Sequence, residues 1–267
     1  AQLMADQPTH RLAQLSDLHL TAQNTPLAGQ IDTEALLRLA FRRLADSGLD
    51  FDGVILSGDL TDTGSSEAYQ RLQHVIAEQS GLLGCPVLVG AGNHDEGLNF
   101  NRTLGPADSV AEIRGLRVIQ LDSSVPGAGH GEITHDQLAW LTRQLAGPVR
   151  HGTVLVVHHP PVPSASAVMS RFALRNPDDL AEVLVGSDVR IILSGHLHVP
   201  GSATLAGIPV AIAGGLSYAA DPMYQNRGYR AMTEAQSFTV VELYPGQVVT
   251  MVVPVSAHST LYQIDVG

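Results

Sequence analysis

The chain has 267 residues, of which 44% are hydrophobic and 15% are charged, and this composition excludes an intrinsically disordered polymer. The formal net charge is −11 and the lysines and arginines are scattered, so we expect no basic face that would bind an extended nucleic acid. No apolar run approaches the ~20 residues that a membrane-spanning helix needs. A small anionic substrate is still compatible with the sequence if metal cations supply positive charge locally.

The beginning of the sequence and its cysteine content indicate the compartment. Residues 1–10 contain no basic segment followed by an apolar stretch, which predicts a cytoplasmic protein without a signal peptide. The one cysteine, Cys85, permits neither an intramolecular disulfide nor a thiolate metal site. It stands before Pro86 at the start of an apolar run, and we interpret it as a small core residue.

Short apolar runs alternate with helical patterns over the first three quarters of the chain. Runs rich in Val, Ile and Leu predict buried strands at residues 11–16, 53–57, 86–90, 117–121, 153–157 and 190–194. Apolar residues at helical spacing predict helices between them, around residues 36–44, 69–76, 138–145 and from 176 onward. Asp32 is the expected N-cap of the first helix, and Thr134 with Gln137 forms a capping box for the third.

The pattern changes to strands and turns after residue 201. Strands are predicted at residues 203–205, 210–213, 238–243 and 248–253, and no linker or repeat separates them from the earlier part. We therefore predict one α/β domain over residues 1–267. Its unusual polar motifs fall in residues 17–198, and we expect the β-rich residues 202–267 to build a second, mixed sheet.

Five polar clusters interrupt this pattern, and each follows a predicted strand. They are Asp17-Leu18-His19, Gly58-Asp59-Leu60-Thr61-Asp62, Gly92-Asn93-His94-Asp95, His158-His159-Pro160-Pro161 and Gly195-His196-Leu197-His198. Each cluster alone is weak evidence, because Gly-Asp after a strand is commonly a turn and His-His-Pro-Pro can be a rigid loop. Ligands in α/β sheets bind beyond the carboxyl ends of the strands, so five clusters at that edge predict one composite site.

The residue types in these clusters favour a metal centre. Asp, His and Asn offer oxygen and imidazole ligands suited to Fe, Mn or Zn. The patterns D-x-H and H-x-H place two side chains on one side of an extended segment, where they can hold one ion or two neighbouring ions. More than four such ligands imply a second ion, and two ions ~3.5–4 Å apart are a common device for phosphate ester hydrolysis.

The remaining histidines lie outside these clusters. We expect five of them at the surface or in helices, namely His10, His74, His135, His151 and His258. His130, within residues 127–131, is left without an assignment.

With these motifs the sequence closely resembles the calcineurin-like metallophosphoesterase superfamily, whose signature is D-x-H, G-D-x-x-D, G-N-H-[DE], a His before Pro, and G-H-x-H. The motifs span about two thirds of the chain and none is missing. The resemblance implies a four-layer αββα sandwich with two mixed sheets flanked by helices. It assigns one metal ion to Asp17, His19, Asp59 and His198. It assigns the second ion to Asp59, as a bridge, with Asn93, His158 and His196, and it leaves His159 beside the metals.

The resemblance also implies the catalytic groups. His94 faces the substrate in the family, where it protonates the leaving oxygen or stabilises charge on the phosphate. Asp62 resembles the carboxylate that hydrogen-bonds this histidine and keeps it cationic and oriented. The nucleophile is then a hydroxide that bridges the two ions.

Neighbouring residues indicate the subfamily. Thr63-Gly64 replaces the arginine of protein Ser/Thr phosphatases, and Asp62 stands where purple acid phosphatases have tyrosine. Residues 121–127, residues 131–133 with Trp140-Leu141, and residues 158–161 look most like bacterial class III cyclic nucleotide phosphodiesterases. This implies hydrolysis of 3′,5′-cyclic AMP and related cyclic nucleotides to the 5′-monophosphate by a homo-oligomer.

Two alternatives remain open from the sequence. One is hydrolysis of glycerophosphodiesters or other small diesters. The other is a metal-loaded scaffold or nucleotide sensor without turnover, against which the intact His94 and Asp62 argue. Residues that bind the base are expected in the irregular stretches 169–176 or 218–229.

Overall fold

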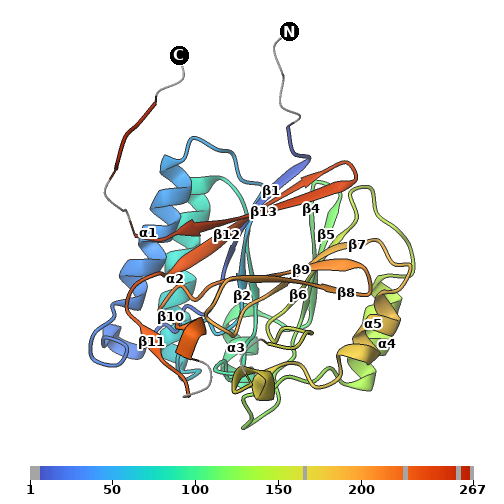
Figure 1. The fold of residues 1–267 in the computed structure, drawn as a ribbon, viewed down its shortest axis with the longest axis horizontal. Helices are drawn as coiled ribbons and strands as arrows, with labels where there is room; N and C mark the ends of the chain where they lie inside the picture. Colours follow the sequence, from blue (N-terminus) through green and yellow to red (C-terminus); the bar gives the residue numbers. More distant parts are fainter. Residues whose placement is uncertain (1–6, 165–166, 225–227, 257–259, 265–267) are drawn as a thin grey trace.

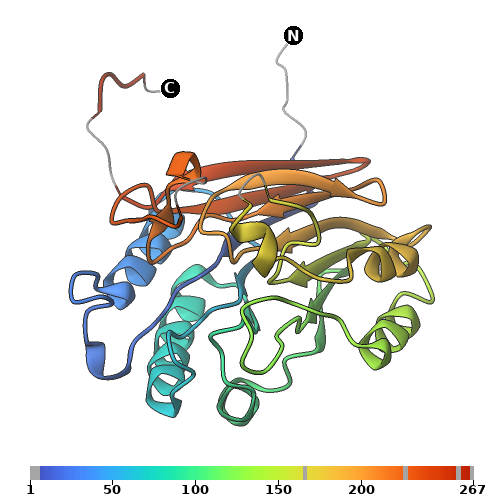
Figure 2. The same cartoon turned by 60° about the horizontal axis from the view of Figure 1, so that its bottom comes forward.

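The computed structural model describes residues 7–164, 167–224, 228–256 and 260–264. Two β-sheets pack face to face, and helices cover the outer face of each sheet (Figure 1). Figure 2 shows the same layers after a 60° turn. The predicted four-layer αββα sandwich is therefore confirmed.

The first sheet has the strand order β13-β12-β1-β2-β3. Its parallel strands are β1 (His10–Leu15), β2 (Gly53–Ser57) and β3 (Val87–Gly90). Its antiparallel strands are β12 (Ser237–Tyr244) and β13 (Gln247–Pro254). The helices of this half of the molecule are α1 (Thr33–Asp46), α2 (Ser66–Leu83) and α3 (Gly97–Leu104).

The second sheet has the order β4-β5-β6-β7-β9-β8. Its parallel strands are β5 (Leu116–Leu121), β6 (Thr153–Val157), β7 (Val189–Ser194) and β9 (Ile208–Ile212). Its antiparallel edges are β4 (Ser109–Ile113) and β8 (Gly201–Leu205). Helices α4 (His135–Gln144) and α5 (Pro177–Leu184) pack on its outer face.

Shorter elements connect these layers. Strands β10 (Ala219–Ala220) and β11 (Ala231–Met232) pair antiparallel as a separate ribbon. Single 3₁₀ turns occur at η1 (Ala22–Asn24), η2 (Met169–Phe172) and η3 (Pro222–Tyr224).

The late strands do not build a sheet of their own, so that part of the sequence prediction is wrong. Strand β9 pairs with β7 in the second sheet, whereas β12 pairs with β1 in the first sheet. The reason is burial: seven of the eight residues of β12 are buried, which requires a place between other strands. Neither β4 nor α3 was predicted. Strand β4 is a half-exposed edge strand, and α3, unlike the equally short α5, has no Pro at its start.

Local sequence signals explain where the helices begin. The Asp32 side chain accepts a hydrogen bond from the Ala35 amide at the start of α1, and Thr134 and Gln137 form the predicted capping box of α4. Pro177 occupies the first position of α5. None of the helices in the described ranges is both long enough and apolar enough to traverse a bilayer.

Three apolar clusters hold the layers together. One lies between the two sheets and contains Leu12, Ile55 and Val154, and the other two lie under the helices of each half. Burial of apolar surface contributes roughly 25 cal/mol per Å², so the cluster between the sheets stabilises their packing. The packing of the two sheets in turn brings the motifs of both sheets to the same edge. Cys85 is buried, as predicted.

The histidines outside the motifs fall into several environments. His74 on α2 and His135 on α4 are exposed, as expected. The expectation for His10 is wrong: it is buried in β1, its Nε2 bonds to the Ile113 carbonyl at 2.9 Å, and burial lowers its pKa. His151 is half-buried with its ring 4.9 Å from that of His10. His130 is half-buried, and His258 lies outside the described residues.

Candidate metal centre

The five polar clusters meet at one edge of the sandwich. They follow β1, β2 and β3 of the first sheet and β6 and β7 of the second. Backbone hydrogen bonds join the turns directly, from the Asp17 amide to the Gly58 carbonyl at 3.0 Å and from the Gly195 amide to the His158 carbonyl at 3.0 Å. The predicted composite site therefore exists, and backbone hydrogen bonds join two pairs of its turns.

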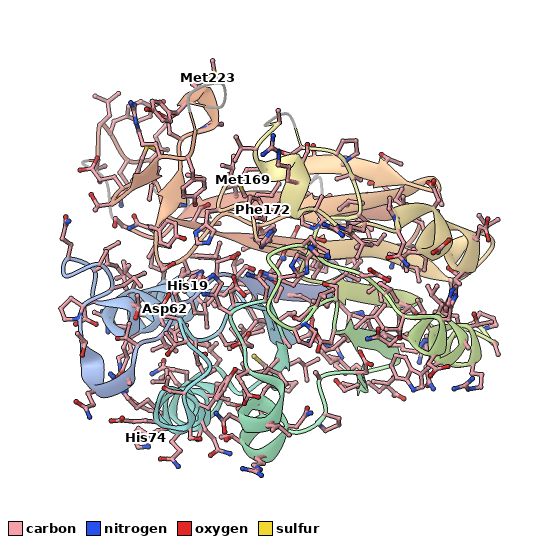
Figure 3. All side chains as sticks on the ribbon, turned by 90° about the horizontal axis from the view of Figure 1, so that it is seen from below. His19, Asp62, His74, Met169, Phe172 and Met223 are labelled. Atoms are coloured by element: carbon pink, nitrogen blue, oxygen red, sulfur yellow. The ribbon has the colours of Figure 1, made fainter. Side chains whose placement is uncertain are left out.

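Three groups of side chains gather here, two of which share His19, and the ligand atoms of each group lie within 4.8 Å of one another. The groups are Asp17 with His19 and His198; Asp59 with His158 and His196; and His19 with Asp62 and His94. Figure 3 shows His19 and Asp62 close together in the view from below. The structure thus brings together every acidic and histidine residue predicted for the site.

The backbone at the site is unusual at the positions that carry these side chains. Positive φ angles, from 46° to 71°, occur at Asp17, His19, Asp59, His196 and His198. Residues other than glycine seldom adopt this conformation, and its clustering is typical of functional sites. The tight turns direct successive side chains of each motif toward the same centre.

Two glycines of the motifs, Gly58 and Gly92, lie where neighbouring turns approach each other too closely to admit a side chain. A Cβ atom on Gly92 would lie 2.3 Å from the Asp59 amide nitrogen, and one on Gly58 would lie 2.3 Å from His158 Nδ1. Real Cβ atoms essentially never come this close to other atoms, so only glycine at these two positions lets the three turns pack together.

Backbone carbonyls fix the tautomers of two buried histidines. His158 Nδ1 donates to the Ser57 carbonyl at 2.9 Å, and His198 Nδ1 donates to the Tyr218 carbonyl at 2.9 Å. A carbonyl only accepts, so the Nδ1 atoms carry the protons and each Nε2 is left to face the site. These Nε2 atoms lie 3.4 Å from Asp59 Oδ2 and 3.3 Å from Asp17 Oδ1, respectively.

The buried carboxylates keep a negative charge in this setting. Burial by itself raises the pKa of Asp59, but the neighbouring His158 outweighs burial and holds that pKa well below its usual range. Burial likewise raises the pKa of Asp17, but the neighbouring His198 outweighs burial and holds that pKa below its usual range. Burial lowers the pKa of His158, yet Asp59 and Asp17 raise it to about 10. The site therefore attracts positive charge, and a metal ion can take the place of the proton on His158.

Several buried ligand atoms support the fit of metal ions. Within the described part of the chain, His158 Nε2, His196 Nε2 and Asn93 Oδ1 are buried without a hydrogen-bond partner. An unsatisfied buried polar atom costs about 1–3 kcal/mol, and coordination to a cation removes that cost. The donors are imidazole nitrogens, carboxylates and one amide oxygen, a set that fits Fe, Mn or Zn.

His94 and Asp62 lie on the open side of the centre, with side chains 42% and 31% exposed. A hydrogen bond between the Asp62 carboxylate and the His94 ring was expected, but the ring bonds to the main chain of Asp62 instead. His94 Nδ1 donates to the Asp62 backbone carbonyl at 2.8 Å, whereas the Asp62 carboxylate lies 4.0 Å from that atom. The carboxylate instead accepts from His19 Nδ1 at 3.2 Å. Asp62 therefore orients His94 through its main chain and His19 through its side chain.

His159 lies behind the centre, as expected. Its Nδ1 is 2.7 Å from Ser123 Oγ, and its ring centroid is 4.5 Å from that of His196. Burial lowers the pKa of His159, so the ring is neutral. The ring of His159 packs against the candidate ligand His196. His159 belongs to none of the three candidate metal-binding groups that the described residues form.

Sequence reasoning missed the role of Asp95. Its carboxylate is buried and accepts hydrogen bonds from the Leu60 and Gly92 amides, at 3.0 and 2.9 Å, and from the Tyr69 hydroxyl at 2.8 Å. It thereby ties the turn after β2 to the turn after β3. Burial raises the pKa of Asp95 to about 6. The signal was the acidic residue that ends the G-N-H-D motif, for which no function was assigned.

The fold and the site together define a metal-dependent phosphoesterase. The family model described as calcineurin-like phosphoesterase matches residues 10–200, and the chain belongs to this family. Its D-x-H, G-D-x-x-D, G-N-H-D and G-H-x-H motifs all lie within the matched residues.

Particular relatives match over nearly the whole chain. A probable cyclic nucleotide phosphodiesterase from Rhodococcus erythropolis is 41% identical over 95% of this chain and 86% of its own length. A cAMP/cGMP dual specificity phosphodiesterase from Mycobacterium tuberculosis is 38% identical over 95% of this chain and 82% of its own. Among solved structures, a dimetal phosphatase from Danio rerio superposes with a TM-score of 0.66 at 15% identity, covering 93% of this chain and 97% of that one, which supports the fold.

Proposed function

We propose that the protein is a metal-dependent phosphodiesterase that hydrolyses 3′,5′-cyclic AMP and related cyclic nucleotides to the 5′-monophosphate. The observation that carries the proposal is a buried cluster of ionised carboxylates and imidazole nitrogens, with an exposed histidine, His94, at its rim. Two relatives named as cyclic nucleotide phosphodiesterases, 41% and 38% identical over 95% of the chain, support this substrate class.

The proposed ligand sets follow the groups of side chains. One ion is held by Asp17, His19, Asp59 and His198, and the other by Asp59, Asn93, His158 and His196. The bridging role of Asp59 is supported by its Oδ2 atom, which lies 3.6 Å from His19 Nε2 and 3.4 Å from His158 Nε2. We expect iron or manganese in these sites.

The ions, when bound, neutralise phosphate oxygens and provide an activated water at neutral pH. Their charge also offsets the net charge of −11 in the neighbourhood of an anionic substrate. The protein's own contribution is to hold the ligands in place and to position His94. Its Nδ1–H is held by the Asp62 carbonyl, which leaves Nε2 to deliver a proton to the departing 3′ oxygen.

Further parts of the proposal concern the whole molecule. We propose a single domain, because the apolar cluster between the sheets and the bond from Gln14 Nε2 to the Ser194 carbonyl, 2.8 Å, join both halves. We also propose a homo-oligomer, since edge strand β13 exposes Val249, Met251 and Val252 by 39–54%. A cytoplasmic location stays a prediction from the sequence.

One assay tests the proposed activity. The metal-reconstituted protein is incubated with cyclic AMP, cyclic GMP and glycerophosphocholine side by side. We expect 5′-AMP from cyclic AMP, loss of turnover with a strong chelator, and recovery with Mn²⁺ or Fe. Rapid cleavage of glycerophosphocholine without turnover of cyclic AMP would identify a glycerophosphodiesterase instead. Binding without any turnover would identify a metal-loaded nucleotide sensor.

A further inference from the structure

A cavity of about 340 Å³ lies beside the candidate metal centre. Asp62 and Tyr218 form the wall nearest the centre. The other walls come from two segments outside the motifs, residues 27–31, which precede α1, and residues 231–233, at and after β11. The cavity is thus enclosed by parts of the chain that are 200 residues apart in sequence.

Two residues of the cavity wall contact candidate ligands of the centre. The Asp62 carboxylate lies 3.2 Å from His19 Nδ1. The Tyr218 ring stacks on the His198 ring with centroids 4.0 Å apart and an interplanar angle of 19°. Asp62 and Tyr218 therefore each contact a candidate metal ligand and also line the cavity.

The lining has the chemistry of a site for a flat, neutral ring. Leu27, Ile31, Met232 and the Tyr218 ring supply apolar surface, while the uncharged side chains of Gln30 and Thr233 are able to bond the polar edge of such a ring. The charged group in the lining is Asp62, an acid, so the cavity disfavours a second phosphate.

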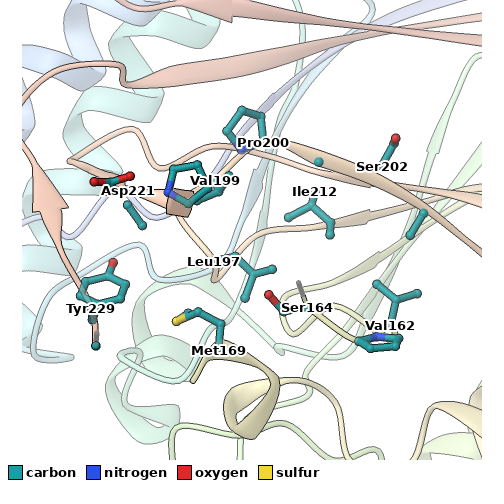
Figure 4. Close-up of a pocket in the computed structure, with 16 residues that line it drawn as sticks. Val162, Ser164, Met169, Leu197, Val199, Pro200, Ser202, Ile212, Asp221 and Tyr229 are labelled. Atoms are coloured by element: carbon teal, nitrogen blue, oxygen red, sulfur yellow. The ribbon is translucent and has the colours of Figure 1, made fainter. Parts of the chain in front are cut away.

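A second cavity, of about 250 Å³, is the alternative location (Figure 4). It is lined by Leu197, Met169, Val162 and Tyr229, together with strand residues such as Ser202. No candidate metal ligand, and neither His94 nor Asp62, is among the residues that line it. The turn that carries His196 and His198 contributes Leu197 to its wall.

We propose that the cavity beside Asp62 and Tyr218, hereafter the base cavity, binds the nucleobase of the substrate. This inference rests on the proposed function, because it assumes a substrate whose phosphate is bound at the metal centre. The proposal agrees only in part with the base-binding stretches expected from the sequence. Tyr218 lies in one of them, Met169 lines the other cavity, and residues 27–31 and 231–233 were not among them.

The test fills each cavity in turn. Ala231→Trp places a large side chain in the base cavity from an exposed position on β11, and Ser202→Trp does the same for the other cavity from an exposed position on β8. The readout is calorimetric binding of 5′-AMP and of ribose 5-phosphate, which lacks the base, to the metal-loaded protein. Turnover of cyclic AMP and of the abasic ribose 3′,5′-cyclic phosphate is measured in parallel.

We expect wild type and Ser202→Trp to bind 5′-AMP about tenfold or more tightly than ribose 5-phosphate, a difference typical of filling an apolar pocket. Ala231→Trp should bind the two equally while its affinity for ribose 5-phosphate is unchanged. Equal binding already in wild type, or loss of the preference in Ser202→Trp alone, overturns the inference. Failure of the proposed function is a separate result: neither cyclic phosphate is turned over, whatever the binding preference.

Discussion

The buried and the open sides of the metal centre are built differently. Asp17, Asp59, His158 and His198 have side chains at most 5% exposed, and protein hydrogen bonds fix the two histidines. His94, by contrast, is 42% exposed and is held by one main-chain carbonyl. The difference indicates that the buried side is organised to hold metal ions and the open side to meet the substrate. Substitutions on the buried side should therefore reduce metal binding, whereas substitution of His94 on the open side should reduce turnover while the metal stays bound.

Asp59→Ala should give the largest effect, with loss of both ions and turnover near background. The reason is that its carboxylate faces both ligand groups. Elemental analysis after gel filtration measures the metal content. Asn93→Ala is the matched control and should lose about half of the metal, which added Mn²⁺ restores. Nearly two ions per chain in the Asp59 variant would exclude the bridging role.

His94→Ala should keep its metal and lose a factor of ~10²–10⁴ in turnover of cyclic AMP, the usual contribution of general acid catalysis. The effect on bis(p-nitrophenyl) phosphate should be much smaller, because nitrophenolate leaves without a proton. Steady-state rates for both substrates provide the comparison. Equal slowing of both would mean that His94 binds the phosphate rather than protonating the leaving oxygen.

Asp95→Ala tests the connection between the two turns that carry Asp59 and Asn93. Loss of its hydrogen bonds should lower the free energy of unfolding by about 2–4 kcal/mol. Displacement of the turns should reduce turnover of cyclic AMP by about 10²-fold. Urea denaturation and initial rates measure the two effects. Tyr69→Phe removes one of the bonds and should cost about 1 kcal/mol with little change in rate. A fully active Asp95 variant would contradict the positioning role.

Asp62→Asn should have the smallest effect, about a tenfold decrease in turnover. The main-chain carbonyl that holds His94 remains, while the charge beside His19 is lost. Metal titration should therefore show weaker binding, and the two substrates of the His94 experiment should be slowed alike. A selective loss on cyclic AMP would show that the carboxylate acts on His94 after all.

The sequence predicted those features that depend on local patterns. Apolar runs located the strands that precede the motifs, and residue type with spacing located the side chains of the centre. Features that depend on long-range pairing were not predictable. The split of β9 and β12 between two sheets depends on partners far away in sequence. Likewise, residues 27–31 and 231–233 carry no motif and form a cavity only after folding.

The left-handed backbone at Asp17, His19, Asp59, His196 and His198 has a consequence for the lifetime of the protein. Such conformations cost about 1–3 kcal/mol each, so without ions this edge is poised to open locally. Ions that bind only the closed form add RT ln(1 + [L]/Kd) to stability. Metal supply would then set the resistance of this edge to proteolysis, and with it the lifetime of the chain, as well as its activity.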